Sequence, residues 1–256
     1  MCRHLAYLGP PVSLADCLLQ QPHSLVHQSW APLDMRGGGT VNADGFGVGW
    51  HSGGQGDELV ARRYRRDRPI WSDASLADLA ASVTSGAILA GVRSATAGMP
   101  VTEAACAPFL EGPWMFSHNG VVRGWPQSVR PLAKTLPADA LMTLEAPTDS
   151  AFLWALVRMR PREGATPAAA VAGVVTEVLA LAPGSRLNLL LHDGRNLAAT
   201  TVSHSLSVLQ LEDSITVGSE PLDPGEPRWQ PVPDGCLLEA TATHHRIRPL
   251  FDTQPG

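Results

Sequence analysis

Cys2 is the residue with the clearest chemical potential in this chain, because only Met1 precedes it. A small side chain at position 2 is the usual condition for removal of the initiator methionine. Cys2 would then carry a thiol and a free α-amine, which titrate near pH ~8.5 and ~8. Such an amine can take the thiol proton and pass it to a leaving group. The N-terminus therefore predicts a nucleophile with its own base, although a cysteine near the start of a chain often has no catalytic role.

A possible pair of oxyanion donors lies at Asn119-Gly120, where a predicted strand ends. The Asn119 side-chain amide and the unobstructed backbone N–H of Gly120 can converge on the oxygen of a tetrahedral intermediate. Asn-Gly is also the commonest dipeptide of tight turns. Both interpretations remain open from these residues alone.

Charged side chains follow two other predicted elements. Arg93 ends the apolar strand predicted over Ala87–Val92, and the Thr96 hydroxyl comes three residues later. A guanidinium there suits a small carboxylate held at two points, or a structural ion pair. Asp149 begins a predicted helix, where a carboxylate can cap the helix, bind a substrate ammonium, or do both through different oxygens.

The elements that must position these residues are mostly strands. We predict strands over Arg3–Leu8, Gly45–His51, Glu58–Tyr64, Ala87–Arg93, Trp114–His118, Leu187–His192, Leu197–Val202, Ser205–Leu211, Ser214–Gly218 and Gly235–Ala240. Tight turns are expected at Gly53–Gly56 and His192–Arg195.

Helical spacing is confined to a few segments. We predict helices over Leu14–Leu19, Ser75–Val83, Val129–Leu136, Ser150–Met159 and Ala168–Leu181. Thr148, Asp149 and Ser150 are all good N-cap residues for the fourth of these helices. The order of strand block, helical block and second strand block favours an α+β fold built in layers.

The Gly-rich run from Asn42 to Trp50 leads into a strand, whereas a phosphate-binding loop would open a helix. We interpret its glycines as sites of close backbone packing beside the N-terminal strand.

Composition excludes several classes of partner. The chain has 256 residues and a net charge of −5, so neither a nucleic acid nor a membrane surface is expected to bind it. The N-terminus lacks the features of a signal peptide and no apolar run approaches the ~20 residues of a membrane span, so we expect a cytoplasmic protein. We expect one domain over residues 2–250 and a frayed tail over 251–256.

No metal site or disulfide framework is expected. The four cysteines, at positions 2, 17, 106 and 236, are too widely spaced for a zinc ligand pair or a compact disulfide set. Among the nine histidines, His244 and His245 are adjacent, and neighbouring side chains on a strand point to opposite faces.

Six segments in order resemble the class II glutamine amidotransferases, which are N-terminal-nucleophile hydrolases. They are Met1-Cys2, Asn42–Trp50, Val92–Thr96, Ser117–Gly120, Thr148–Ser150 and Ser219–Pro221. The resemblance covers residue 2 to about 240. It implies a four-layer αββα sandwich without a metal or cofactor, and hydrolysis of a γ-glutamyl amide through a thioester.

The resemblance also implies roles for individual residues. Cys2 would be the nucleophile and its amine the base, while Asn119 and Gly120 would form the oxyanion hole. Arg93 and Thr96 would hold the α-carboxylate of a glutamyl group, Asp149 would hold its α-ammonium, and His118 would belong to the substrate-binding set. The known amidotransferases carry Arg-Gly shortly before the Asp of the Gly-rich segment, where this chain has Val41-Asn42-Ala43-Asp44.

Four further segments are similar to a subgroup of free-standing amidohydrolases from ergothioneine biosynthesis: Cys2–Leu5, Gln28–Pro32, Arg93–Pro100 and Arg186–Leu189. In that subgroup the leaving amine belongs to a histidine betaine, whose quaternary ammonium suits an aromatic wall. Trp30, Trp71 and Trp114 are candidates for this wall, although a core position is the more common role for any one of them.

Two other functions remain alternatives. One is a glutaminase subunit that supplies ammonia to a separate synthase, and the other is a non-catalytic glutamate-sensing module. The expected partner is a small γ-glutamyl molecule, and the sequence leaves a homodimer open.

Overall fold

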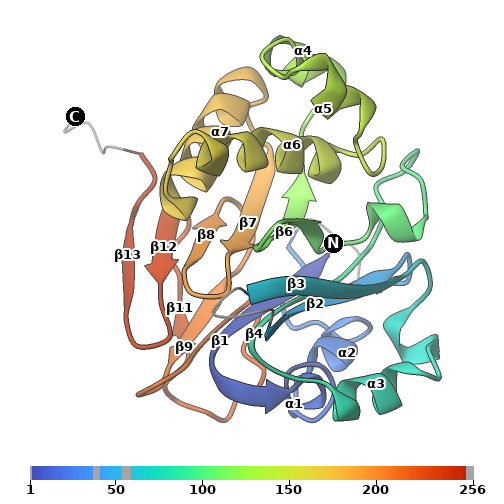
Figure 1. Ribbon diagram of the computed structural model, residues 1–256, viewed down its shortest axis with the longest axis vertical. Helices are drawn as coiled ribbons and strands as arrows, with labels where there is room; N and C mark the ends of the chain where they lie inside the picture. Colours follow the sequence, from blue (N-terminus) through green and yellow to red (C-terminus); the bar gives the residue numbers. More distant parts are fainter. Residues whose placement is uncertain (1, 37–40, 54–58, 252–256) are drawn as a thin grey trace.

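Two antiparallel sheets lie face to face in the computed structural model, which describes residues 2–36, 41–53 and 59–251 (Figure 1). The seven-stranded sheet has the order β11-β9-β10-β1-β4-β2-β3. Its strands are β1 (Arg3–Ser13), β2 (Phe46–Gly53), β3 (Leu59–Arg66), β4 (Thr84–Val92), β9 (Ser207–Gln210), β10 (Ile215–Gly218) and β11 (Gln230–Pro231).

The six-stranded sheet has the order β13-β12-β8-β7-β6-β5. Its strands are β5 (Phe109–Glu111), β6 (Trp114–Val121), β7 (Arg186–His192), β8 (Leu197–Thr201), β12 (Cys236–Ala240) and β13 (His245–Pro249). In both sheets the neighbouring strands pair antiparallel throughout.

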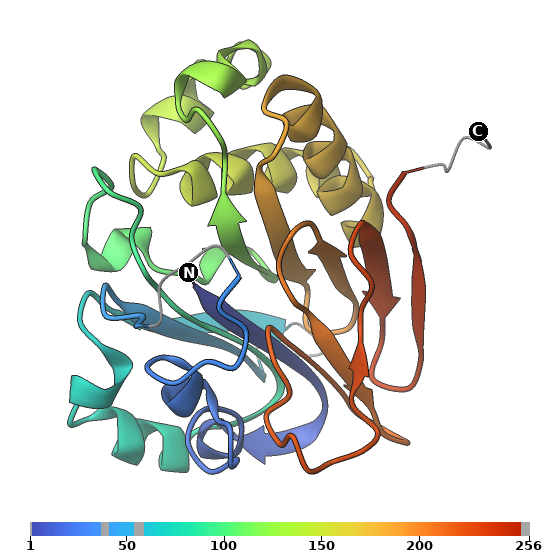
Figure 2. The ribbon, with the colours of Figure 1, turned by 180° about the vertical axis from the view of Figure 1, so that it is seen from behind.

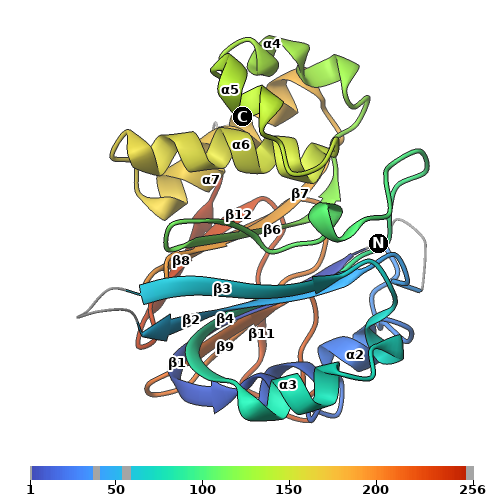
Figure 3. The ribbon, with the colours of Figure 1, turned by 45° about the vertical axis from the view of Figure 1, so that its right-hand side comes forward.

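Helices cover the outer face of each sheet, and this gives the four-layer αββα sandwich that the resemblance predicts (Figure 3). On the seven-stranded sheet lie α1 (Leu14–Leu18), α2 (Leu25–Gln28) and α3 (Leu76–Ser82). On the six-stranded sheet lie α6 (Asp149–Arg162) and α7 (Pro167–Leu181). The short helices α4 (Arg130–Ala133) and α5 (Ala138–Met142) lie farther from the sheet, with α5 against α6. Short 3-10 turns occupy Ile70–Ser72, Glu103–Ala105 and Gln127–Val129.

Alternation along β1 explains why this strand can lie at the centre of the sandwich. Leu5 and Tyr7 pack into the apolar layer beneath α1 and α3, whereas Ala6 and Leu8 pack into the layer between the two sheets. A third apolar layer lies between the six-stranded sheet and helices α6 and α7. Residues 3–8 of β1 are therefore buried, and Figures 2 and 3 show the N-terminus where this strand begins in the seven-stranded sheet.

All ten predicted strands have a counterpart in the structure, as do the five predicted helices, with shifts of a few residues at their ends. The helix predicted over Val129–Leu136 is broken into a 3-10 turn and the four-residue α4, which has Pro131 in its first turn. The sequence did not predict α2, α5, β5, β11 or β13. Residues 54–56 of the predicted turn and residues 252–256 of the predicted tail lie outside the described residues.

The Gly-rich segment is placed differently from the prediction in one respect. It forms the start of β2, which pairs with β3 and β4, so β4 separates it from β1. Its close packing is confirmed, because a Cβ at Gly47 would collide with the carbonyl oxygen of Ala107 and one at Gly49 with the sulfur of Met115. None of the helices formed by the described residues is long and apolar enough to cross a membrane.

Candidate active site

Cys2 lies directly before β1, at the edge where three strands of the seven-stranded sheet end or begin. Arg3 pairs with Val92 at the end of β4, and Val92 pairs in turn with Phe46 at the start of β2. This register brings Arg93 beside Cys2, as expected from strands that end together. The Cys2 thiol lies 3.7 Å from the carbonyl oxygen of Ser94.

A small cavity opens in front of the Cys2 thiol. Besides Cys2, its lining includes Arg93, Cys106, His118 and Ser150. The Nη1 atom of Arg93 is buried and has no hydrogen-bond partner among the described residues. Because a buried guanidinium nitrogen is normally paired, this atom is available to an anionic group in the cavity.

The backbone around Arg93 is held firmly from the side of β2. The Arg93 N–H donates to the Gly45 carbonyl at 2.7 Å, and the Asp44 N–H donates to the Arg93 carbonyl at 3.0 Å. Asp44 Oδ2 also accepts from the Ala95 N–H at 2.7 Å. The Asp of the Gly-rich segment thus fixes the turn that carries Arg93.

Asn119 and Gly120 lie near the end of β6, on the other sheet. The Asn119 side chain is buried, its Nδ2 donates to Ser219 Oγ at 3.3 Å, and its Oδ1 has no partner among the described residues. One Nδ2 hydrogen therefore remains for another acceptor. A Cβ at Gly120 would collide with the carbonyl oxygen of Arg186, so glycine is required where β6 and β7 approach each other.

Asp149 is the first residue of α6, and Thr148 rather than Asp149 caps the helix. The Thr148 side chain accepts from the Ala151 N–H at 3.2 Å. The buried Asp149 carboxylate accepts instead from the Val122 N–H at 2.9 Å through Oδ2 and from the Ser150 N–H at 2.8 Å through Oδ1. Each oxygen keeps a lone pair, so the carboxylate can still receive an ammonium group.

The His118 ring is held from both sides, by Ser150 of α6 and by Arg186 of β7. Its Nδ1 lies 3.0 Å from Ser150 Oγ and its Nε2 lies 3.0 Å from the Arg186 carbonyl oxygen. Because a carbonyl only accepts, Nε2 carries the proton and Nδ1 accepts from the Ser150 hydroxyl. Burial lowers the pKa of His118, so the ring is neutral near pH 7 and suits a fixed lining group.

Of the predicted site residues, Cys2, Arg93 and His118 line this cavity, whereas Asn119, Gly120 and Asp149 do not. Thr96 does not line it either. It is exposed, and it borders a more open hollow together with Met99, Val121, Arg123 and Trp125. Arg93 and Thr96 are thus not brought together on one cavity in this structure.

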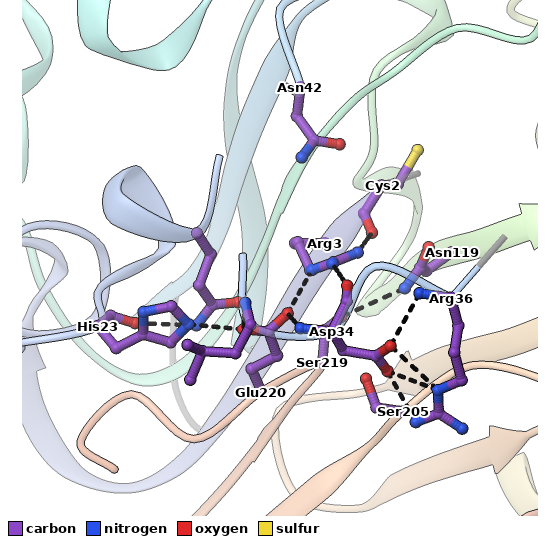
Figure 4. A network of polar contacts seen from close by, with 12 residues as sticks. Cys2, Arg3, His23, Asp34, Arg36, Asn42, Asn119, Ser205, Ser219 and Glu220 are labelled. Atoms are coloured by element: carbon purple, nitrogen blue, oxygen red, sulfur yellow. Dashed lines mark hydrogen bonds and ion pairs between the residues drawn. The ribbon is translucent and has the colours of Figure 1, made fainter. Parts of the chain in front are cut away.

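The polar groups behind Cys2 were not predicted from the sequence. Glu220 is buried and accepts from Arg3 Nε at 2.9 Å and from His23 Nε2 at 2.6 Å, and Arg3 also contacts the Cys2 carbonyl (Figure 4). Burial alone would raise the pKa of Glu220, but its hydrogen bonds outweigh this effect and lower it. The segment Ser219-Glu220-Pro221 was part of the resemblance, but no pattern linked it to His23.

Two other polar groups near Cys2 also escaped prediction. Cys106 places a second thiol on the cavity wall, and burial raises the pKa of this thiol to about 11, so it stays protonated. Asn42 lies on the opposite side of Cys2 from Glu220 (Figure 4), and its buried Oδ1 has no partner among the described residues.

The tryptophan side chains differ in exposure. Trp30 is 51% exposed and its ring meets that of His27 edge-on at 4.6 Å, while Trp71 is 45% exposed. Trp114 packs against the apolar layer beneath α6 and α7. Of these three side chains, Trp30 and Trp71 are the more exposed.

The fold, and a cysteine placed before a central strand, agree with the comparison to known families. A family model described as class-II glutamine amidotransferases matches residues 18–238. The chain belongs to the class II glutamine amidotransferase family.

Individual relatives extend this result over nearly the whole chain. The chain is 42% identical to the gamma-glutamyl-hercynylcysteine sulfoxide hydrolase of Mycolicibacterium smegmatis over 250 residues, 98% of this chain and all of the relative. It is 38% identical to the enzyme of that name from Mycobacterium tuberculosis over 241 residues, 94% of this chain and 93% of the relative.

Solved structures agree with the fold. A glutamine aminotransferase class-II domain protein from Silicibacter pomeroyi superposes with a TM-score of 0.69 at 25% identity, covering 98% of this chain and all of the other. The glutamine phosphoribosylpyrophosphate amidotransferase of B. subtilis gives a TM-score of 0.66 at 14% identity, over 98% of this chain and half of that enzyme, which supports the fold alone.

Proposed function

We propose that this chain hydrolyses γ-glutamyl-hercynylcysteine sulfoxide to hercynylcysteine sulfoxide and glutamate, with Cys2 as the nucleophile. The observation that carries the proposal is the unpaired, buried Nη1 of Arg93, a residue that lines the same cavity as Cys2. A partly buried cation beside a thiol suits a substrate with a carboxylate a short distance from its scissile carbonyl. The names of the two mycobacterial relatives support the identity of the leaving group.

In the proposed reaction the α-amine of Cys2 takes the thiol proton, and the sulfur attacks the γ-carbonyl carbon. The carbonyl oxygen becomes an oxyanion that accepts from Asn119 Nδ2 and the Gly120 N–H. The C–N bond then breaks, the departing nitrogen takes the proton from the α-ammonium, and a thioester remains on Cys2. Water attacks this thioester and releases glutamate and the free thiol.

The glutamyl end is the constant part of any such substrate. We assign its α-carboxylate to Arg93 and Thr96, and its α-ammonium to Asp149. His118 supports this end as a neutral ring, because its two nitrogens are engaged by Ser150 and Arg186. The leaving amine is then what distinguishes one γ-glutamyl substrate from another.

The test is glutamate release from γ-glutamyl-hercynylcysteine sulfoxide and, separately, from glutamine. We expect kcat/KM to be much larger for the first substrate, and Cys2→Ala to abolish both reactions without unfolding the chain. Preferred hydrolysis of glutamine would instead favour the glutaminase alternative, and no release from either substrate would favour the sensing module.

A further inference from the structure

Glu220 is the acceptor at the centre of a buried polar network that lies behind Cys2. Its side chain is buried, and its two oxygens receive four donors. Oε1 accepts from Arg3 Nε at 2.9 Å and from the Asp34 N–H at 3.0 Å. Oε2 accepts from His23 Nε2 at 2.6 Å and from the Leu33 N–H at 2.9 Å.

The network connects Glu220 to the backbone of the nucleophile through one side chain. Arg3 Nη1 donates to the Cys2 carbonyl at 2.9 Å, while Arg3 Nη2 donates to the Asp34 carbonyl. One guanidinium therefore contacts Glu220, Cys2 and the loop containing Asp34. Figure 4 shows Arg3 between the carboxylate of Glu220 and Cys2.

The residue before Glu220 reaches the other half of the site. The Ser219 N–H donates to the His4 carbonyl at 2.9 Å, and the His4 N–H donates to Ser219 Oγ at 3.0 Å. Ser219 Oγ also accepts from Asn119 Nδ2 at 3.3 Å. The pair Ser219-Glu220 thus contacts both the strand that follows Cys2 and the side chain assigned to the oxyanion.

A charged carboxylate is needed to hold these parts together. Four donors converge on two oxygens, and an amide has only one oxygen to offer them, since its nitrogen is itself a donor. Replacing the carboxylate by an amide therefore leaves donors without an acceptor in a buried place. His23 can change tautomer and accept from the amide nitrogen, but Arg3 and the Leu33 and Asp34 N–H groups are donors only.

We propose that Glu220 is a positioning residue, which fixes the backbone of Cys2 through Arg3 and holds the Leu33–Asp34 segment next to it. It touches no reacting atom. Its effect is to set where the thiol and α-amine of Cys2 stand relative to Asn119. The inference rests on the proposed function, because it assigns the effect of Glu220 to the attack by Cys2.

Three variants test this role. Glu220→Gln removes the charge, and Arg3→Lys keeps a cation that cannot reach Glu220, Cys2 and Asp34 together. Glu111→Gln is the matched control, because Glu111 also joins two arginines, Arg158 at 3.1 Å and Arg162 at 2.7 Å, at the far end of α6. For each variant we would measure kcat and KM for γ-glutamyl-hercynylcysteine sulfoxide, and backbone hydrogen exchange by mass spectrometry in the free protein.

We expect Glu220→Gln to lower kcat at least tenfold with a change in KM below threefold, and to speed exchange at Leu33 and Asp34 at least tenfold. Arg3→Lys should lower kcat similarly while the Leu33 amide stays protected, because Glu220 still accepts from it. If Glu220→Gln does not fold, Arg3→Lys alone tests whether the Glu220–Arg3 contact positions Cys2. Glu111→Gln should leave all three quantities unchanged.

A folded Glu220→Gln or Arg3→Lys variant with kcat within twofold of the parent protein would overturn the inference. An equal loss of kcat in Glu220→Gln and in the control Glu111→Gln would also overturn it. If the parent protein released glutamate from no γ-glutamyl amide, the proposed function would fail instead, while exchange at Leu33 and Asp34 would still report whether Glu220 holds that segment.

Discussion

The carboxylate of Asp149 accepts a hydrogen bond from the backbone N–H of Val122 at 2.9 Å. This contact joins the first turn of α6 to the residues that follow Asn119 and Gly120. The side chain assigned to the α-ammonium is thereby held at a fixed position relative to the pair assigned to the oxyanion.

Asp149→Asn should weaken substrate binding while the protein stays folded. The amide oxygen can still accept from Val122 or Ser150, but the charge that attracts an ammonium is lost. We expect KM for γ-glutamyl-hercynylcysteine sulfoxide to rise about tenfold or more, since hydrogen bonds to charged groups contribute about 1.5–3 kcal/mol. Steady-state kinetics would measure this effect, with Tm as the check on folding. An unchanged KM would remove Asp149 from the binding site.

Asn119→Ala should act on the rate of the chemical step. One oxyanion donor contributes ~10²–10³ in kcat, because it acts where charge develops. We therefore expect kcat to fall by about that factor with little change in KM. Ser219→Ala is an informative control, because it removes the acceptor of the Asn119 amide and leaves the amide itself. An effect of Asn119→Ala confined to KM would place the residue in ground-state binding.

Arg93→Lys should be damaging although it preserves the charge. Lys lacks the planar fork that holds a carboxylate at two points, and the unpaired Nη1 of Arg93 would be lost with it. We predict that kcat/KM falls roughly 10- to 150-fold, the equivalent of about 1.5–3 kcal/mol. The factor should be similar for several γ-glutamyl amides with different leaving groups. A change in leaving-group preference would show that Arg93 contacts the variable end.

Buried histidines should make the free energy of unfolding depend on pH. Burial lowers the pKa of His4, His192 and His204 to about 3, against 6.5 for an exposed imidazole. Between pH 6.5 and about 3 the unfolded chain therefore binds more protons than the folded chain, so stability falls as the pH falls.

The expected slope is up to about 1.4 kcal/mol per pH unit for each such histidine. Urea unfolding at several pH values between 7.5 and 5 would measure it. His192→Gln should reduce the slope, because it removes one of these histidines. The ring of His192 pairs with that of His51, with centroids 5.4 Å apart, and not with a residue of the proposed site. Equal slopes in the parent protein and this variant would contradict the assignment.

The site residues that the sequence predicted lie next to the ends of apolar strands, and the pairing of those strands fixes their positions. Cys2 and Arg93 adjoin because β1 and β4 are antiparallel neighbours, and the apolar runs of both strands are visible in the sequence. Thr148, a good N-cap residue, did mark the start of α6, but which of three adjacent candidates caps the helix depends on backbone geometry.

No sequence pattern predicted the polar network around Glu220. Glu220 and His23 are 197 residues apart, and a buried ion pair leaves no periodic pattern in either segment. The short elements α2, α5 and β5 were missed for another reason. They span only three to five residues each, too few for a hydrophobic period, and their conformation is fixed by the packing of neighbouring elements.

The most direct test of the account is detection of the glutamyl thioester on Cys2. The parent protein would be mixed with γ-glutamyl-hercynylcysteine sulfoxide, quenched in acid within the first turnover, digested, and analysed by mass spectrometry. We predict an N-terminal peptide that begins at Cys2 and carries one glutamyl group, absent from Cys2→Ala. A fully active protein that retains Met1, or a glutamyl group found only on another residue, would contradict the account.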